Sequence, residues 1–273
     1  MTGTGEGGNV LYLKTGRDML LSMHHPSSKF RRTLSIALAF AVAAAPLSAI
    51  ADLFDEAAEF FSEGDYEAAL ERYDEILEEN PDLFEAWYNR ALTHFELGEY
   101  QSAIDDFTQA EELESDVDEL YFQRATAHLR LEQYDRAVVD FSEYIDRQPE
   151  DLQALNNRGV VLVRLDRLED AERDFSRAIE LDETFTEAWY NRGNVRLDMG
   201  SYEEASDDFS TVLEAEPERV DAVFNRGNAR YSMGDYEAAM QDFYRSIELN
   251  EDFAEAYYNL GLAYIRYADS IRE

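Results

Sequence analysis

The chain has 273 residues, of which 60 are acidic and 24 are lysine or arginine, giving a formal net charge of −36. A surface this acidic disfavours nucleic acid and anionic membranes as partners, because both repel negative charge. The chain has no cysteine, which excludes disulfides, thiol nucleophiles, zinc–cysteine sites and a cysteine-linked lipid anchor.

Residues 1–22 are rich in glycine and show no periodic pattern of apolar residues. We interpret them as an N-terminal extension, with Met19 and Met23 as alternative translation starts. Lys14 and Lys29 are the only lysines in the sequence, so arginine alone supplies positive charge beyond residue 50. A lysine-free, acidic body indicates adaptation to high ionic strength; the alternative is an acidic protein with no particular salt preference.

Residues 23–51 have the three parts of a secretory signal peptide. A basic stretch at 29–32 precedes the apolar run Leu34–Ala45, and Ala49-Ile50-Ala51 supplies the small residues of a cleavage site. The apolar run is shorter than the roughly 20 residues of a membrane-spanning helix, although retention as a membrane anchor is the alternative. We expect export by the general secretory route, cleavage near Ala51, and a periplasmic or extracellular mature chain that begins at Asp52.

Beyond this leader, one short phrase recurs every 34 residues. Its clearest copies are Trp87-Tyr88-Asn89-Arg90 and Trp189-Tyr190-Asn191-Arg192, and Gln123 fills the one gap in the asparagine series. The asparagines of the series are Asn89, Asn157, Asn191, Asn225 and Asn259. A fixed period of this length predicts a solenoid of stacked supersecondary units.

The register extends from residue 50 without an insertion. The blocks are residues 50–83, 84–117, 118–151, 152–185, 186–219 and 220–253, and a half-block follows at 254–273. Position 8 of every block is small, and in the last four copies it is Gly159, Gly193, Gly227 and Gly261. Position 24 is aromatic, namely Tyr73, Phe107, Phe141, Phe175, Phe209 and Phe243. Small residues let two helices approach closely, and aromatics fill the space beside them.

Each block also carries signals for a turn near its middle or a stop at its end. The mid-block glycines are Gly64, Gly98, Gly200 and Gly234. The prolines near block ends are Pro81, Pro149 and Pro217. Glycine favours the left-handed conformation that ends many helices, and proline cannot continue one. Each block is therefore predicted to form a helix, a tight turn and a second helix.

These features resemble the tetratricopeptide repeat family over residues 50–273, because most positions of its Trp, Leu-Gly, Tyr, Ala, Phe and Pro pattern are met. The sequence departs from that pattern at position 7, where arginine replaces leucine in five blocks. The residues at position 11, where an aromatic is usual, are His94, His128, Leu162, Arg196 and Arg230. The resemblance implies an all-α, right-handed superhelical solenoid, with six repeats over residues 52–253 and a capping helix over 254–273.

The capping helix is apolar for the end of a solenoid, which needs a polar outer face. We expect three of its residues to face the sixth block: Tyr257, Gly261 and Tyr264. We expect Leu260 and Tyr267 to face the second helix that the half-block lacks. Two explanations of the apolar surface remain open. Either the chain end with Ile271 covers it, or it is a homodimer contact.

No catalytic or metal-binding pattern stands out in the sequence, which has no glycine-rich phosphate loop, serine elbow or paired catalytic carboxylates. His94 and His128 lie one repeat apart without a third ligand or a nucleophile in phase, so we interpret them as substitutes for packing aromatics. The acidic stretch Glu111–Glu119 lacks the spacing and central glycine of a calcium loop. We predict no enzymatic activity, no cofactor and no metal.

The resemblance implies that the first helices of the repeats line a concave groove for an extended protein segment. The candidate groove residues are Tyr88, Asn89, Phe122, Gln123, Asn156, Asn157, Tyr190, Asn191, Asn194, Phe224, Asn225, Asn228, Tyr258 and Asn259. The aromatics would stack on apolar side chains of the partner, or pack only against neighbouring helices. The amides would hold the partner's backbone, as the asparagine ladder of O-linked N-acetylglucosamine transferase does, or make structural hydrogen bonds within the repeats.

The expected partner is a basic protein segment. Position 2, on the rim of the groove, is acidic in five of six copies from Glu85 onward. The first helices of the repeats also carry no lysine of the kind with which members of the family clamp a C-terminal carboxylate. A chaperone tail is therefore disfavoured as the partner.

Positions 7 and 23 change sign together, which indicates an ion pair within each block. The arginine–aspartate pairs are Arg90 and Asp106, Arg124 and Asp140, Arg158 and Asp174, Arg192 and Asp208, and Arg226 and Asp242. Block one inverts both signs with Glu56 and Arg72, and the half-block, which has no position 23, carries Leu260. Antiparallel helices joined near position 15 bring positions 7 and 23 level. We predict partly buried structural ion pairs; independent surface charge is the alternative.

These patterns together favour a non-enzymatic scaffold or adaptor in the cell envelope that binds an extended protein segment in its groove. Two other functions remain open. One is a structural homo-oligomer built through the terminal helices. The other is an accessory factor of an envelope peptidase or hydrolase.

Overall fold

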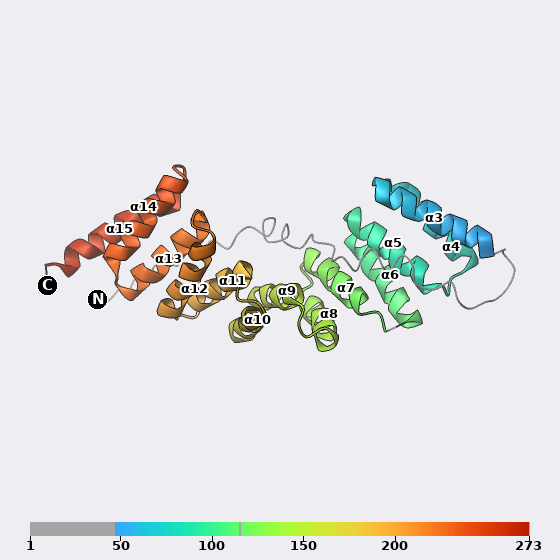
Figure 1. Cartoon of the computed structure of the whole chain (residues 1–273), viewed down its shortest axis with the longest axis horizontal. Helices are drawn as coiled ribbons and strands as arrows, with labels where there is room; N and C mark the ends of the chain where they lie inside the picture. Colours follow the sequence, from blue (N-terminus) through green and yellow to red (C-terminus); the bar gives the residue numbers. More distant parts are fainter. Residues whose placement is uncertain (1–46, 115, 273) are drawn as a thin grey trace, which may run out of the picture. The chain divides into compact units, whose positions relative to one another are not determined.

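The computed structural model describes residues 47–114 and 116–272. These residues form thirteen α-helices and, within the same ranges, no strand (Figure 1). None of these helices is both long enough and apolar enough to cross a membrane. Of the expected leader, only residues 47–51 are described, and they begin the first helix. The rest of the leader and the expected N-terminal extension lie outside the described residues.

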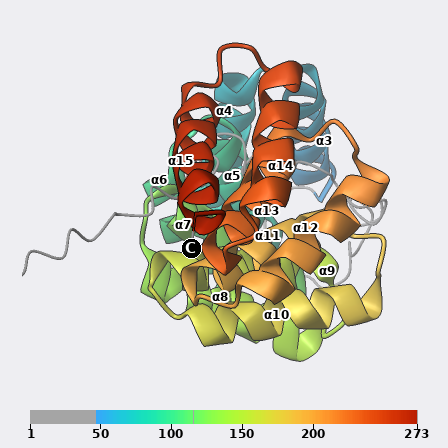
Figure 2. The same cartoon turned by 90° about the vertical axis from the view of Figure 1, so that its left-hand side faces the viewer.

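Each block contributes a pair of helices. The first helices are α3 (Leu47–Glu63), α5 (Phe84–Glu96), α7 (Asp118–Arg130), α9 (Leu152–Arg164), α11 (Thr186–Asp198), α13 (Val220–Met233) and, in the half-block, α15 (Ala254–Ser270). The second helices are α4 (Tyr66–Glu79), α6 (Tyr100–Leu113), α8 (Tyr134–Arg147), α10 (Leu168–Leu181), α12 (Tyr202–Ala215) and α14 (Tyr236–Leu249). Each helix packs against its neighbours in the chain, as α14 does against α15 (Figure 2). The all-α solenoid predicted from the 34-residue period is confirmed.

The turn inside each block needs one residue in the left-handed region of backbone space. In the sixth block Gly234 ends α13 with φ of 86°, and the Asp235 side chain then accepts a hydrogen bond from the Ala238 amide to start α14. Two blocks have no glycine at this place, and there Glu132 and Asp166 take φ of 57°. This conformation costs a residue with a Cβ roughly 1–2 kcal/mol. The packing of the repeat must therefore stabilise these two turns.

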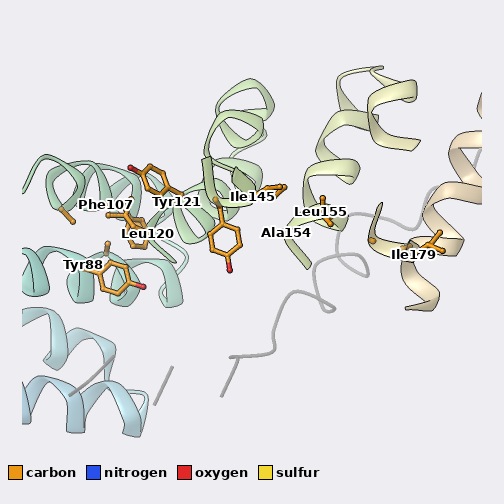
Figure 3. Close-up of a cluster of buried hydrophobic side chains, with 14 residues drawn as sticks. Tyr88, Phe107, Leu120, Tyr121, Ile145, Ala154, Leu155 and Ile179 are labelled. Carbon is orange, nitrogen blue, oxygen red and sulfur yellow. The ribbon is translucent and has the colours of Figure 1, made fainter. Parts of the chain in front are cut away.

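The core of each block is an aromatic ring held against a small residue. The rings of Phe175, Phe209 and Phe243 are fully buried. A Cβ added at Gly159, Gly193 or Gly227 would lie only 2.6 to 2.9 Å from the ring of the second helix of the same block. Only glycine therefore allows this approach. The second block uses Ala91 and Phe107 instead, and Tyr88 meets Phe107 edge-to-face at 5.8 Å between ring centroids (Figure 3).

The orientation expected for the capping helix α15 is wrong for four of its five residues. The fifth, Tyr264, does meet the sixth block, because its ring lies edge-on to Tyr244 of α14 at 6.2 Å between ring centroids. Leu260 is buried and Tyr267 partly buried, and both pack with Phe224 and Phe243 of the sixth block. Three residues are instead exposed: Tyr257, Gly261 and Tyr264. The reason is that these three positions form the helix face that receives the second helix of the same block, as Gly227 receives Phe243. Ile271 is 69% exposed, so it does not cover the apolar surface.

Candidate functional site

Most of the candidate groove aromatics belong to the core. Tyr88, Tyr190 and Phe224 are buried. Tyr190 meets Phe209 at 5.8 Å and Phe224 meets Phe243 at 5.7 Å between ring centroids. Burial raises the pKa of the Tyr88 and Tyr190 hydroxyls, as expected for phenols that water does not reach. The structure therefore favours packing over partner stacking for these three residues.

Two candidate aromatics remain within reach of a partner. Phe122 is half-buried, in edge-to-face contact with Phe141 and Tyr144. Tyr258 on α15 is 69% exposed.

The buried ring of Tyr190 is further covered by the guanidinium of Arg219, which lies 4.2 Å from the ring centroid. A cation placed in this way is attracted by the face of the ring and shields it from solvent.

The candidate asparagines join successive first helices to one another. The inter-repeat bonds run from Asn191 Nδ2 to Asn156 Oδ1 at 2.8 Å, from Asn225 Nδ2 to Asn194 Oδ1 at 2.8 Å, and from Asn259 Nδ2 to Asn228 Oδ1 at 2.7 Å. Asn225 Nδ2 also lies 3.3 Å from the Tyr190 hydroxyl. In every case the donor is at position 6 and the acceptor belongs to the preceding repeat. These amide donors therefore serve the structure of the array.

The oxygen atoms of the same position-6 amides are not used in bonds between repeats. Among the described residues, no donor is recorded for the Oδ1 atoms of Asn191, Asn225 and Asn259. Asn89 is half-buried, and its side chain makes no hydrogen bond within the described ranges. Asn157 differs from both, because it is almost fully buried and its Nδ2 finds no acceptor. Gln123 donates weakly to Glu119 at 3.4 Å.

The predicted ion pairs are present in the structure. In each of five blocks the arginine donates from Nε and Nη2 to the two carboxylate oxygens of the aspartate, at 2.7 to 3.0 Å. The inverted pair of block one, Arg72 and Glu56, is looser at 3.5 Å. The aspartates Asp106, Asp140, Asp174, Asp208 and Asp242 are all buried. For Arg158, the hydrogen bond to Asp174 is the largest cause of its raised pKa.

Each arginine has a second connection that sequence reasoning missed. Its Nη1 lies near position 25 of the preceding block, where the partners are Asp74 at 2.6 Å, Thr108 at 3.5 Å, Ser142 at 3.1 Å, Ser176 at 3.1 Å and Ser210 at 3.3 Å. One guanidinium thus bridges two repeats. The signal was available in the sequence, since position 25 is a small or acidic oxygen acceptor in five successive blocks.

Position 11 completes this polar network. Arg196 and Arg230 donate to Asp208 and Asp242 at 2.9 and 2.8 Å. His94 and His128 point Nε2 towards Asp106 and Asp140 at 3.8 and 3.7 Å. Their Nδ1 atoms contact Glu99 and Gln133 at 2.7 and 2.8 Å. The histidines are therefore members of the polar network, which corrects their interpretation as substitutes for packing aromatics. The described residues contain no cluster of three or more possible metal ligands.

Comparison with protein-family models matches the chain to repeat families along most of its described length. Models described as "Tetratricopeptide repeat" match residues 54–116 and 122–184, and, in a second model, residues 186–219. A model described as "TPR repeat" matches residues 227–266. A search of curated proteins gives no match.

Solved structures with the same fold include a protein named YrrB, described as a TPR protein with an unusual peptide-binding site. It is 26% identical, with a TM-score of 0.62 over 68% of this chain and 96% of that one. The C-terminal part of a TPR repeat-containing protein from Cytophaga hutchinsonii is 19% identical, with a TM-score of 0.67 over 80% of this chain and 88% of that one. A tetratricopeptide repeat protein from Parabacteroides merdae is 18% identical, with a TM-score of 0.62 over 79% and 99%.

Proposed function

The chain belongs to the tetratricopeptide repeat family, and from this premise we propose that it is a non-enzymatic adaptor that binds an extended segment of another protein along its first helices. Tetratricopeptide repeat proteins are in general scaffolds for protein–protein interaction. The similar protein YrrB is described as having a peptide-binding site, which supports peptide binding by this fold. An accessory role for an envelope peptidase or hydrolase is the special case in which the bound segment belongs to that enzyme.

The observation that carries the proposal is the row of position-6 amides on the first helices. The Oδ1 atoms of Asn191, Asn225 and Asn259 receive no donor from the described residues, while the Nδ2 atoms of the same amides are fixed by the preceding repeat. Each acceptor is thus oriented in advance. Asn191 and Asn225 are buried, and the half-buried Asn259 is the one of the three within reach of a partner. An extended peptide presents backbone N–H groups that need acceptors, and main-chain pairing of this kind gives affinity with little sequence preference.

The negative charge of the protein favours a basic segment as the partner. Position 2 of the first helices is acidic at Glu85, Glu119, Glu187, Asp221 and Glu255. The chain as a whole carries −36, so a segment rich in lysine or arginine is attracted over a long range. We expect these rim charges to act mainly on the association rate and its salt dependence. Exposed Tyr258 and half-buried Phe122 would contact the apolar side chains of the segment.

The test uses synthetic extended peptides of equal length that are basic, neutral or acidic. We expect the basic peptides to bind, and Asn89→Ala to weaken binding by up to about tenfold, which is about 1.4 kcal/mol. The matched control is the outer-face change Glu203→Gln with Glu204→Gln, since both residues are exposed on α12. Binding that is lost in the outer-face variant and kept in Asn89→Ala would contradict a groove site.

We further propose that the protein acts in the cell envelope. The support is the leader pattern of residues 23–51 in the sequence. Cleavage after Ala51 would remove the first residues of α3 but keep Leu53 and Phe54, which pack against the first block's core. Fractionation of cells that express the whole chain should give a soluble protein in the envelope fraction. Its mass should be that of a chain that begins at Asp52. A cytosolic species that retains residues 23–51 would overturn the location.

A further inference from the structure

The face of α15 formed by Tyr257, Gly261 and Tyr264, here called the acceptor face, is shaped to receive a helix. Its residues stand at positions 4, 8 and 11 of the repeat. In the fourth to sixth blocks the glycine at position 8 is pressed against a phenylalanine ring from the second helix of the same block. The acceptor face therefore repeats a surface that three other blocks use for helix–helix contact.

On α15 this surface is open. Apart from the adjacent residues and backbone of its own helix, no described atom lies within 4 Å of a Cβ built on Gly261, whereas the equivalent position on Gly227 meets the Phe243 ring at 2.8 Å. Tyr257 is 51% and Tyr264 is 45% exposed. Tyr264 contacts Tyr244 of α14, through a hydroxyl–hydroxyl hydrogen bond and an edge-to-face ring contact at 6.2 Å between centroids. The open surface over Gly261 is thus flanked by two aromatic rings, about one helical turn to either side.

Exposed apolar side chains concentrate around this face. Most of the large hydrophobic residues that are exposed in the described part of the chain lie on α14, on α15 or just after it, namely Tyr244, Tyr257, Tyr258, Tyr264, Ile265 and Ile271. A concentration of exposed apolar side chains at one end of an array favours an interaction site there.

The acceptor face also lies in a segment with little net charge. Residues 254–273 contain the acids Glu255, Asp269 and Glu273 and the bases Arg266 and Arg272, a formal charge of −1 in a chain whose formal charge is −36. Two copies of so acidic a chain repel each other over most of their surface. Contact between copies is less opposed where the local charge is close to zero.

We propose that the acceptor face binds the same face of a second copy, in an antiparallel two-fold contact. A two-fold interface must be self-complementary. The acceptor face meets this requirement, because it supplies both the open surface at Gly261 and aromatic rings of the kind that cover such a glycine in other blocks. In this arrangement Tyr264 or Tyr257 of each copy packs over Gly261 of the other, as Phe243 packs over Gly227. This proposal does not rest on the proposed groove function.

The first experiment measures the mass of the purified chain by sedimentation over a range of protein and salt concentrations. We expect a concentration-dependent dimer that is lost in Gly261→Leu and in Tyr264→Ser. A leucine at Gly261 has free space in the monomer, so an unchanged helical signal will separate loss of the contact from misfolding. The matched control is Val139→Ser on α8, which removes a side chain that is 67% exposed and far from α15 in sequence; it should leave the dimer intact.

The second experiment uses the absence of cysteine in the natural chain. Ile265→Cys, at an exposed position beside Tyr264, leaves Gly261 free; it should be joined to a second copy by a short bis-maleimide cross-linker, and Val139→Cys should not. A chain that is monomeric at every concentration would overturn the proposal, as would a dimer that survives Gly261→Leu. A dimer in which Ile265→Cys is not cross-linked would show a contact elsewhere on the chain and would also overturn it.

Discussion

Arg158 donates two parallel hydrogen bonds of 2.7 Å to the carboxylate of Asp174 and at the same time reaches the Ser142 hydroxyl of the preceding repeat at 3.1 Å. The first two bonds join the two helices of one repeat, and the third joins that repeat to its neighbour. Both the stability of a block and the coupling between blocks therefore depend on one guanidinium.

Removal of one partner of this pair should cost more than removal of both. Asp174→Ala leaves the partly buried charge of Arg158 without its main partner, and we expect a loss of about 3 kcal/mol in the free energy of unfolding. Asp174→Ala combined with Arg158→Leu should lose less, because leucine is the usual residue at this position of the family pattern. Urea unfolding of the two variants measures the difference, and equal losses would show that the pair is not coupled.

Adding one methyl group should have opposite effects at two glycines of equivalent position. In Gly227→Ala the new Cβ would lie 2.8 Å from the Phe243 ring, so we expect a loss of about 1–3 kcal/mol. In Gly261→Ala the Cβ meets nothing within 4 Å, so the higher helix propensity of alanine should add up to about 1 kcal/mol. Thermal melts at a protein concentration that keeps the chain monomeric test both signs.

Stability should fall as Asp198 ionises. Burial, reinforced by the charge of Asp166, raises the pKa of Asp198 from its ordinary value of 3.8 to about 6. A raised folded-state pKa favours the protonated form, so its contribution is complete below 3.8 and is lost as pH rises through about 6. Asp198→Asn should flatten this part of the pH–stability curve and, allowing for solvent screening, gain about 1 kcal/mol at neutral pH. An unchanged curve would mean that Asp198 titrates normally.

Salt should stabilise the protein overall. The formal charge of −36 produces repulsion that is screened over roughly 10 Å at about 0.1 M salt, whereas the buried arginine–aspartate pairs are screened much less. Added salt therefore weakens the destabilising repulsion between carboxylates more than it weakens the stabilising ion pairs. We expect the melting temperature to rise steadily towards molar salt. A flat or falling melting temperature would contradict adaptation to high ionic strength.

The hydrogen bonds between asparagines of successive repeats predict a contrast in stability between two asparagines at the same repeat position. Asn225→Ala removes two inter-repeat contacts and leaves Asn194 Oδ1 buried without its donor, so we expect a loss of about 2 kcal/mol. Asn89→Ala removes no hydrogen bond that the described residues make and should change stability by less than about 0.5 kcal/mol. Chemical denaturation of the two variants side by side checks this order.

The helix pairs could be predicted from the sequence because local chemistry repeats with the fold. Gly227 and Phe243 are a small and a large residue on helices that must touch, and the spacing between them recurs in every full block. The orientation of α15 could not be found in the same way. The expectation from the sequence is that Leu260 faces the second helix that the half-block lacks. In fact an apolar residue at this position packs onto the preceding repeat.

The candidate site was less predictable, because one helix face serves two purposes. Tyr190 stands at a position that the family pattern places along the groove, yet its ring completes the core of its own block. Sequence spacing alone does not separate these roles. The pairing of Arg158 with Asp174 was predictable because block one inverts both charges. The contact with Ser142 has a weaker signal, which is a small or acidic oxygen acceptor at position 25 of five successive blocks, with no exchange of sign to single it out.

The arginine bridges also set the unit by which such an array can lengthen. Each standard repeat brings one arginine, one buried aspartate and one small acceptor for the arginine of the following repeat. Duplication or deletion of a whole 34-residue unit therefore keeps every position-7 arginine paired with its position-23 aspartate. An insertion or deletion inside a helix that shifts position 7 against position 23 would separate an arginine from its buried aspartate. Gene duplication in steps of one repeat is thus the route by which this chain can grow without loss of stability.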